Sequence, residues 1–213
     1  GSSSRGGRGA RAGAGGSQPP PASLPADEKL VVMSLGCACF TARFLGARGL
    51  RRFAGPFDWI FSSPAIVSHA LEDGCAALLD PEEYFHVGCP GECAIGHHTY
   101  SRMLGREVVF NHHDPRDSAD HAYFVRAAAR LHWALECANP KLFVLVGVEH
   151  QTPLVDAEVL ALFGALRQAC SRFDLVVVRL LRPVSGAVPG CRGTLRREEA
   201  ACTLAVHELR CRA

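Results

Sequence analysis

The sequence predicts an α/β fold, arranged as a three-layer, doubly wound and mostly parallel sheet with helices on both faces. Residues 141–148 and 175–181 are continuous apolar runs rich in Leu and Val, which is typical of strands covered on both sides. Segments with helical and strand-like patterns alternate between residues 107 and 181. This order favours right-handed parallel crossovers.

The apolar runs place the expected strands. We expect strands over residues 30–35, 107–111, 141–148 and 175–181, and residues 203–209 are a candidate for one more. The predicted core of the two-sided sheet consists of Val31, Met33, Leu35, Phe143, Leu145, Val146, Val176 and Val178.

Helical spacing of apolar residues and local end signals place the expected helices. The first is expected over residues 40–50, and the second starts at Pro64 after the capping residue Ser63 and runs to about residue 79. Gly74 is a weak point within the second helix. Two further helices are expected over residues 117–137 and 156–171.

The first 26 residues differ in composition from the rest of the chain. They are rich in Gly, Ser, Pro and Arg and contain no acidic residue, so we expect a disordered tail. A remnant of a transit peptide is the alternative interpretation. Residues 27–213 are long enough for a substantial core and are predicted to form a single α/β domain.

Charge and cysteine usage limit the possible partners and compartments. Without three tail arginines, the remaining chain has 20 basic and 21 acidic residues, which does not indicate a nucleic-acid surface. No apolar run reaches the length of a membrane span, and no membrane partner is expected. The scattered cysteines and the lack of a visible secretory signal favour reduced thiols in an intracellular, cytoplasmic protein, with organelle targeting as an alternative.

The segment from Ser34 to Cys39 carries the clearest chemical signal. It follows an apolar strand, Gly36 permits a sharp turn, and Cys39 then stands at the start of the expected helix. Free N–H groups and the helix dipole favour an anion at that place, so Cys39 would be stabilised as a nucleophilic thiolate. The alternative is a small apolar residue that fills a strand–helix corner.

Two sequence blocks resemble the DUF1796 family, which is described as putative papain-like cysteine peptidases. The first joins Ser34-Leu35-Gly36-x-x-Cys39, with Ala42 and Leu45, to Gly55-Pro56-Phe57-Asp58-Trp59-Ile60, and the second is Phe110-Asn111-His112-His113-Asp114. The resemblance implies thiol chemistry. It also implies a papain fold with one helical and one barrel-like half, which conflicts with the predicted order of elements, so we retain only the chemistry.

A cysteine hydrolase needs an imidazole beside the thiolate and a group that orients the imidazole. His113 is the first choice for the base because it matches the family block, and His150, at the end of another strand, is a rival. Asp58 is the preferred orienting carboxylate, because the side chains of His113 and its neighbour Asp114 should diverge. Capping and turn roles remain alternatives for each of these residues.

The sequence predicts neither a cofactor nor a metal. Cys89, Cys93, His97 and His98 are residue types that bind zinc, but ordinary loop structure is the default interpretation. The leading functional prediction is a cysteine-dependent hydrolase or acyltransferase acting on an amide, ester or thioester bond. The alternatives are a serine-esterase-type enzyme using Ser34 or a neighbour on a flavodoxin-like sheet, and a non-catalytic module that binds a small ligand.

Overall fold

A computed structural model gives the fold of this chain and describes residues 30–88, 94–149, 151, 153–182, 190–199 and 201–210. The predicted tail of residues 1–26 lies outside this part, and the predicted domain boundary at residue 27 stays a prediction. Within the described part, no helix is both long enough and apolar enough to cross a membrane.

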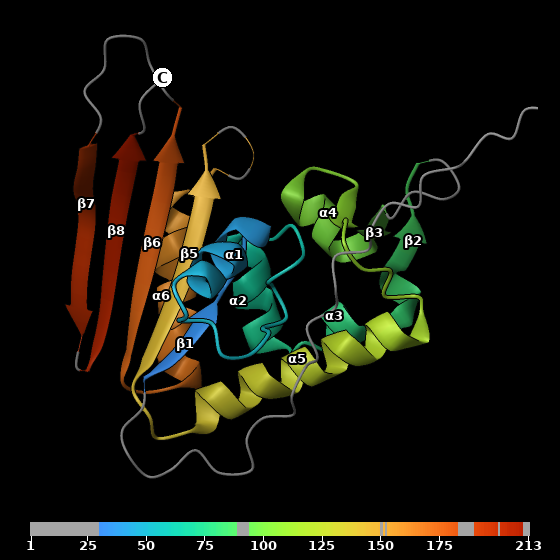
Figure 1. Ribbon diagram of the computed structural model, residues 1–213, viewed down its shortest axis with the longest axis horizontal. Coiled ribbons are helices and arrows are strands. Elements are labelled where there is room, and N and C mark those ends of the chain that lie inside the picture. Colours follow the sequence, from blue (N-terminus) through green and yellow to red (C-terminus); the bar gives the residue numbers. More distant parts are fainter. Residues whose placement is uncertain are drawn as a thin grey trace, which may run out of the picture.

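The main sheet has five strands in the order β1-β5-β6-β8-β7. The strands are β1 (Val31–Ser34), β5 (Lys141–Val148), β6 (Phe173–Leu181), β7 (Gly190–Glu199) and β8 (Cys202–Arg210). All neighbours are parallel except β7 and β8, which form an antiparallel pair at one edge. The adjacent parallel placement of β5 and β6 confirms the prediction for the two Leu/Val-rich runs (Figure 1).

Helices lie on both sides of the sheet, but they do not cover both sides equally. Helix α1 (Cys39–Ala47) packs on one face, where Leu45 contacts Val32 of β1 and Val144 of β5. Helices α2 (Pro64–Glu72), α5 (Ser118–Glu136) and α6 (Asp156–Ala169) contribute to the larger core on the opposite face. Figure 1 shows α1 in front of the strands and α6 behind them.

The face that carries α1 is open over the central strands. Val146, Val176 and Val178 were expected in the core, but they point to this face and are only half-buried. Their neighbours Leu145 and Val177 point to the other face and are fully buried. The predicted three-layer, doubly wound arrangement is therefore not confirmed: the chain is a mixed α/β protein with a mostly parallel sheet, and within the described residues one face lacks full helical cover.

A second, smaller sheet corrects another prediction. Strands β2 (Tyr84–His86), β3 (Ile95–His97) and β4 (Val108–Phe110) form an antiparallel sheet beside helix α4 (His98–Leu104) and a short 3-10 turn, Pro81–Glu83. The run at 107–111 was expected to join the main sheet as part of a parallel crossover, and this expectation is wrong. The neighbour of β1 is β5, reached along the chain only after α5.

Local signals in the sequence correctly placed the start of α2 and lay close to the start of α5. The side chain of Ser63 caps α2 by accepting from the N–H of Ile66, and Asp117 caps α5. The expected second helix is interrupted near Gly74, where Gly74 and Cys75 both have positive φ angles, and α3 (Ala76–Leu79) follows. Edge strand β7 was not expected, because its sequence is polar and contains two glycines.

The alternation of buried and half-buried residues in β6 gives a direct test of the open face. Val177→Ala should reduce the free energy of unfolding by about 2–3 kcal/mol, because it leaves a cavity in a closed core. The matched control Val178→Ala should cost less than about 1 kcal/mol, because that side chain is only partly removed from water. Urea denaturation followed by circular dichroism measures both. Equal losses would show that the open face is covered in solution.

Candidate active site

The candidate site begins at a tight backbone turn between β1 and α1. Gly36 and Cys37 both have positive φ angles, 88° and 81°, a conformation that glycine adopts easily and other residues rarely do. A Cβ atom on Gly36 would lie 2.3 Å from Ser62 Oγ and 2.8 Å from the carbonyl oxygen of Phe57. Glycine is therefore required at this position for conformation and for space.

Three hydroxyl groups hold this turn. The N–H of Gly36 donates to Ser34 Oγ at 3.2 Å, and the N–H of Cys37 donates to Ser62 Oγ at 2.9 Å. Thr41 of α1 donates its hydroxyl to the carbonyl oxygen of Gly36 and accepts from the N–H of Val146 in β5. These bonds fix the start of α1 relative to the sheet. They also account for the burial of the polar residue Ser34, because its hydroxyl accepts a hydrogen bond within the turn.

The two cysteines of this turn have different environments. Cys37 is fully buried, and burial, followed by the negative charge of Glu158, raises the pKa of its thiol far above the usual range. Cys39 is the first residue of α1 and is partly exposed. The cap residue Ala38 provides no side-chain hydrogen bond, and the first turn contains no acidic residue. Cys39, and not Cys37, is therefore accessible to a substrate.

Asp58 is part of the loop that packs beneath this turn. Its Oδ2 atom accepts from Arg51 Nε at 2.7 Å and from the N–H of Gly55 at 3.0 Å. Only 1% of the residue is exposed, and burial raises the pKa of its carboxyl group against the lowering effect of Arg51. The contacts of Asp58 thus fasten residues 51–58 together, and within the described residues none of its hydrogen bonds is to a histidine.

The loop containing Asp58 meets the second family block through a backbone bridge. Ile60 pairs with Phe110 in an antiparallel bridge, and the N–H of Phe61 donates to the carbonyl oxygen of Val109 at 2.8 Å. This bridge places the ring of Trp59 against the ring of His112, with a centroid separation of 5.5 Å. The two sequence blocks are therefore neighbours in space, although β4 is not part of the main sheet.

His113 is oriented by a carboxylate that the sequence analysis did not select. His113 Nδ1 lies 3.0 Å from Asp120 Oδ1, and the His113 ring stacks on Tyr123 at 4.7 Å between centroids. Asp120 also accepts from the N–H of Asp114. The signal in the sequence was the position of Asp120 in the first turn of α5, three residues after the cap Asp117, where a carboxylate can reach back to the preceding loop.

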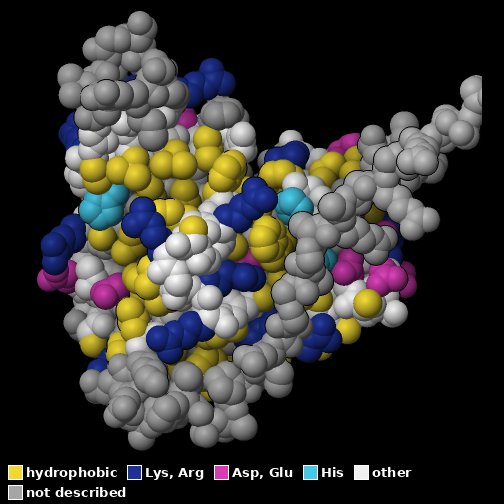
Figure 2. Space-filling model, viewed as in Figure 1, with side chains coloured by type: hydrophobic (Ala, Val, Ile, Leu, Met, Phe, Trp, Pro, Cys, Tyr) yellow, Lys and Arg dark blue, Asp and Glu magenta, His cyan; other side chains and the backbone are white. Residues whose placement is uncertain are grey.

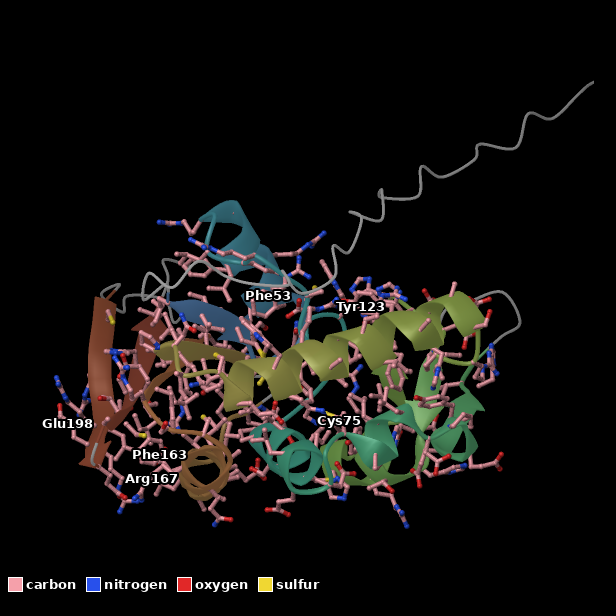
Figure 3. The ribbon with its side chains drawn as sticks, turned by 90° about the horizontal axis from the view of Figure 1, so that it is seen from below. Phe53, Cys75, Tyr123, Phe163, Arg167 and Glu198 are labelled. Atoms are coloured by element: carbon pink, nitrogen blue, oxygen red, sulfur yellow. The ribbon has the colours of Figure 1, made fainter. Side chains whose placement is uncertain are left out.

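Helix α1, which begins at Cys39, and Tyr123, on which the His113 ring stacks, lie on the same side of α5. Figure 3 shows Phe53 and Tyr123 on the side of α5 where α1 lies, with Cys75 on the other side. The pKa of His112 is lowered by partial burial, then by the positive charges of His113 and Arg43. Arg43 lies one helical turn after Cys39, so both residues are on the same face of α1. Because the Arg43 charge acts on His112, this face of α1 is within electrostatic range of that histidine.

The predicted thiol–imidazole pair is not a direct contact in this structure. Across the described residues, no hydrogen bond joins Cys39 Sγ to a histidine ring; such a contact occurs elsewhere, between Cys191 Sγ and His207 Nδ1 at 4.0 Å. Catalytic hydrogen bonds are often long in unliganded enzymes and tighten when substrate binds. The rival base His150 lies outside the described residues.

The structure describes the two histidines considered for zinc but not the two cysteines. Cys89 and Cys93 lie outside the described residues. His97 is fully buried, its Nε2 atom is 2.9 Å from the carbonyl oxygen of Ala77, and its Nδ1 atom accepts from the N–H of Tyr100 to cap α4. Both ring nitrogens are thus occupied. Among the described residues, no cluster of three metal-ligating side chains occurs.

Two glycines near Cys39 provide a matched test of the turn. Gly36→Ala should destabilise the protein by about 3 kcal/mol or more, because it combines an unfavourable φ with a close backbone contact. Gly46→Ala, inside α1 and with no atom near the new methyl group, should stabilise it by up to about 1 kcal/mol. Thermal unfolding measures both. A neutral Gly36→Ala variant would contradict this account of the turn.

The comparisons with known proteins agree with the two sequence blocks. The family model "Putative papain-like cysteine peptidase (DUF1796)" matches residues 30–178, which include the turn, the Asp58 loop, both histidines of the second block and strands β5 and most of β6. No curated protein and no solved structure matches the chain. The match covers more than half of the sequence, so this chain belongs to the DUF1796 family of putative papain-like cysteine peptidases.

Proposed function

We propose that this protein is a cysteine-dependent hydrolase that cleaves a peptide amide bond with Cys39 as its nucleophile. The observation that carries the proposal is the contrast between the two cysteines of the turn. Cys39 is accessible and begins a helix that has no side-chain cap, whereas Cys37 is buried and its raised thiol pKa disfavours a thiolate. The family description supports a peptide as the substrate class.

His113 is the proposed base, and Asp120 replaces Asp58 as the proposed orienting carboxylate. When His113 donates its Nδ1 proton to Asp120, its Nε2 atom carries the lone pair that accepts a proton from the thiol. The proposal requires His113 and Cys39 to approach each other when substrate binds, as catalytic pairs often do. Asp58 contributes indirectly, since it positions the loop that holds Trp59 against His112.

The reaction proceeds in two balanced halves. The Cys39 thiolate attacks the carbonyl carbon, and free N–H groups in the first turn of α1 bind the oxyanion. The C–N bond then breaks as the His113 imidazolium protonates the departing amine, which leaves a thioester on Cys39. Water gives a proton to His113 and attacks this thioester, so the acid is released and the thiolate is restored. An ester or thioester substrate would follow the same steps.

A binding module without catalysis is the second candidate. It is favoured by one observation, the lack of a hydrogen bond between Cys39 and an imidazole among the described residues. The serine-esterase alternative has less support at Ser34, because that residue is only 3% exposed and its hydroxyl accepts from the N–H of Gly36. Thiol reactivity separates an activated Cys39 from an ordinary one.

The proposal predicts selective alkylation of Cys39 at neutral pH. In a Cys191→Ser background, which removes another exposed thiol, iodoacetamide should modify Cys39 faster than any other cysteine, as located by peptide mass spectrometry. His113→Gln should slow this modification about 10-fold, and Asp120→Asn should slow it by a smaller factor. The same protein treated with 4-nitrophenyl acetate should release a burst of nitrophenolate and carry one acetyl group on Cys39.

Three controls decide among the alternatives. Cys37→Ala should leave both reactions nearly unchanged, because the Cys37 thiol is buried. His150→Gln and His112→Gln should each have little effect; a loss confined to one of them would assign the base role to that histidine. If Cys39 reacts no faster than a denatured thiol and none of the substitutions changes its rate, the binding module is the correct interpretation.

A further inference from the structure

The outer surface of α1 and the segment after it has an unusual charge distribution. Residues 39–53 include four arginines and no acidic residue. Arg51 is paired with Asp58, but Arg43, Arg48 and Arg52 are exposed, and no salt bridge is recorded between them and a carboxylate of the described residues. Figure 2 shows dark-blue side chains over this part of the molecule and few magenta ones beside them.

Four other arginines, three of them exposed and one (Arg179) mostly buried, are paired with carboxylates. Arg116 pairs with Asp114, Arg167 with Glu199, Arg179 with Asp156, and Arg196 with Glu198. The chain beyond the first 26 residues has a formal net charge close to zero, so the excess of positive charge on the α1 surface is local. A local excess of one sign attracts a ligand of the opposite sign.

Apolar side chains are interleaved with these arginines. Phe40 is 45% exposed, Phe44 is 52% exposed and Leu50 is 42% exposed. Phe40 and Phe44 form one stripe along α1 at helical spacing, next to the stripe formed by Cys39 and Arg43. The guanidinium of Arg48 lies over the Phe44 ring at 5.3 Å from its centroid, so this ring lies along the surface.

We propose that this surface, defined by Phe40, Arg43, Phe44, Arg48 and Arg52, binds an acidic peptide segment of a protein substrate. The inference rests on the proposed function, and it names the substrate class. Guanidinium groups bind carboxylates in a planar, two-point geometry, and the exposed rings bind apolar side chains between them. A single extended segment with alternating acidic and apolar residues meets both requirements.

The spacing along α1 specifies where the acidic residue lies. Cys39 and Arg43 are four residues apart, which is about 6 Å along a helix axis. Two residues of an extended peptide span about 6.6 Å, and their side chains point to the same side. A carbonyl held at the Cys39 thiol therefore places a carboxylate two positions away next to Arg43.

The geometry favours a peptide over an anionic membrane or a nucleic acid. A membrane-binding helix has a broad apolar face apart from its basic face, whereas Phe40 and Phe44 are interleaved here with arginines, and the Arg48 guanidinium lies beside the exposed Phe44 ring. Binding of nucleic acid depends on many phosphate contacts along an extended basic surface, whereas this surface spans one helix and five following residues. The nucleophile within the same surface also requires a ligand that carries a reactive carbonyl.

Peptide binding can be measured without any catalysis. The probe is a fluorescein-labelled eight-residue peptide of alternating glutamate and leucine, and its anisotropy is followed with the Cys39→Ser protein in low salt. Control peptides carry glutamine or lysine instead of glutamate. We expect binding of the glutamate peptide, binding at least about 10-fold weaker of the glutamine peptide, and none of the lysine peptide.

Two double variants with the same change of net charge locate the site. Arg43→Glu with Arg48→Glu should weaken binding of the glutamate peptide by about 10-fold or more. Arg192→Glu with Arg196→Glu, on β7 at the opposite edge of the sheet from β1, should change it less than about two-fold. Phe44→Ala, with the charges intact, should weaken binding several-fold. Circular dichroism checks that each variant is folded.

Three results would overturn the assignment. The first is equal weakening of glutamate-peptide binding by the two double variants. The second is tighter binding of a single-stranded RNA of equal charge than of the glutamate peptide. The third is tighter binding of vesicles of phosphatidylcholine and phosphatidylserine than of that peptide. The two proposals fail separately. Selective peptide binding by a protein with an inert Cys39 thiol would exclude the catalytic proposal alone, and a reactive Cys39 without selective binding would exclude the acidic substrate alone.

Discussion

The left-handed turn at Gly36 and Cys37 is the constraint on which the rest of the site depends. It reverses the chain at the end of β1 so that α1 begins at Cys39 and packs back on the sheet through Leu45. A non-glycine residue in this conformation costs about 1–3 kcal/mol unless the surroundings compensate. The hydroxyls of Ser62 and Thr41 compensate here, because each satisfies a backbone group that the turn leaves unpaired.

The same turn gives two neighbouring cysteines opposite chemical properties. The reversed backbone directs Cys37 into the core, where removal from water disfavours its thiolate, and leaves Cys39 at the helix start. An extended residue, Ala38, separates them, with φ −172° and ψ −178°. The Cα atoms of residues that flank an extended residue are about 7 Å apart, which is beyond the usual range for a disulfide. The turn therefore favours Cys39 as a free thiol.

Local features of the sequence predicted local structure well. The helix start at Cys39, the cap at Ser63 and the parallel pairing of β5 and β6 were expected, and Gly74 was identified as a weak point, because turn, cap and continuous apolar signals act over a few residues. Pairing between distant segments was harder to predict. The short run of β4 is compatible with either sheet, and only its antiparallel pairing with β3 and its bridge to Ile60 decide the outcome. Val146, Val176 and Val178 show the related limit, since a continuous apolar strand does not reveal which of its faces is left open.

The histidine block reaches the site by a different route from the one expected. We expected the end of β4 to lie beside the end of β1 within one sheet; instead, the Ile60–Phe110 bridge joins β4 to the loop that Asp58 and Arg51 fasten beneath the turn. Strand β1 lies at the sheet edge, and the charge of Arg43, on the same helix as Cys39, acts on His112, whose ring contacts Trp59 of this loop. The family label and the observed sheet are then compatible. The proposed reaction needs only a thiolate, an oriented imidazole and free N–H groups, which can be assembled on unrelated folds, so our proposal does not require the two halves of a papain fold.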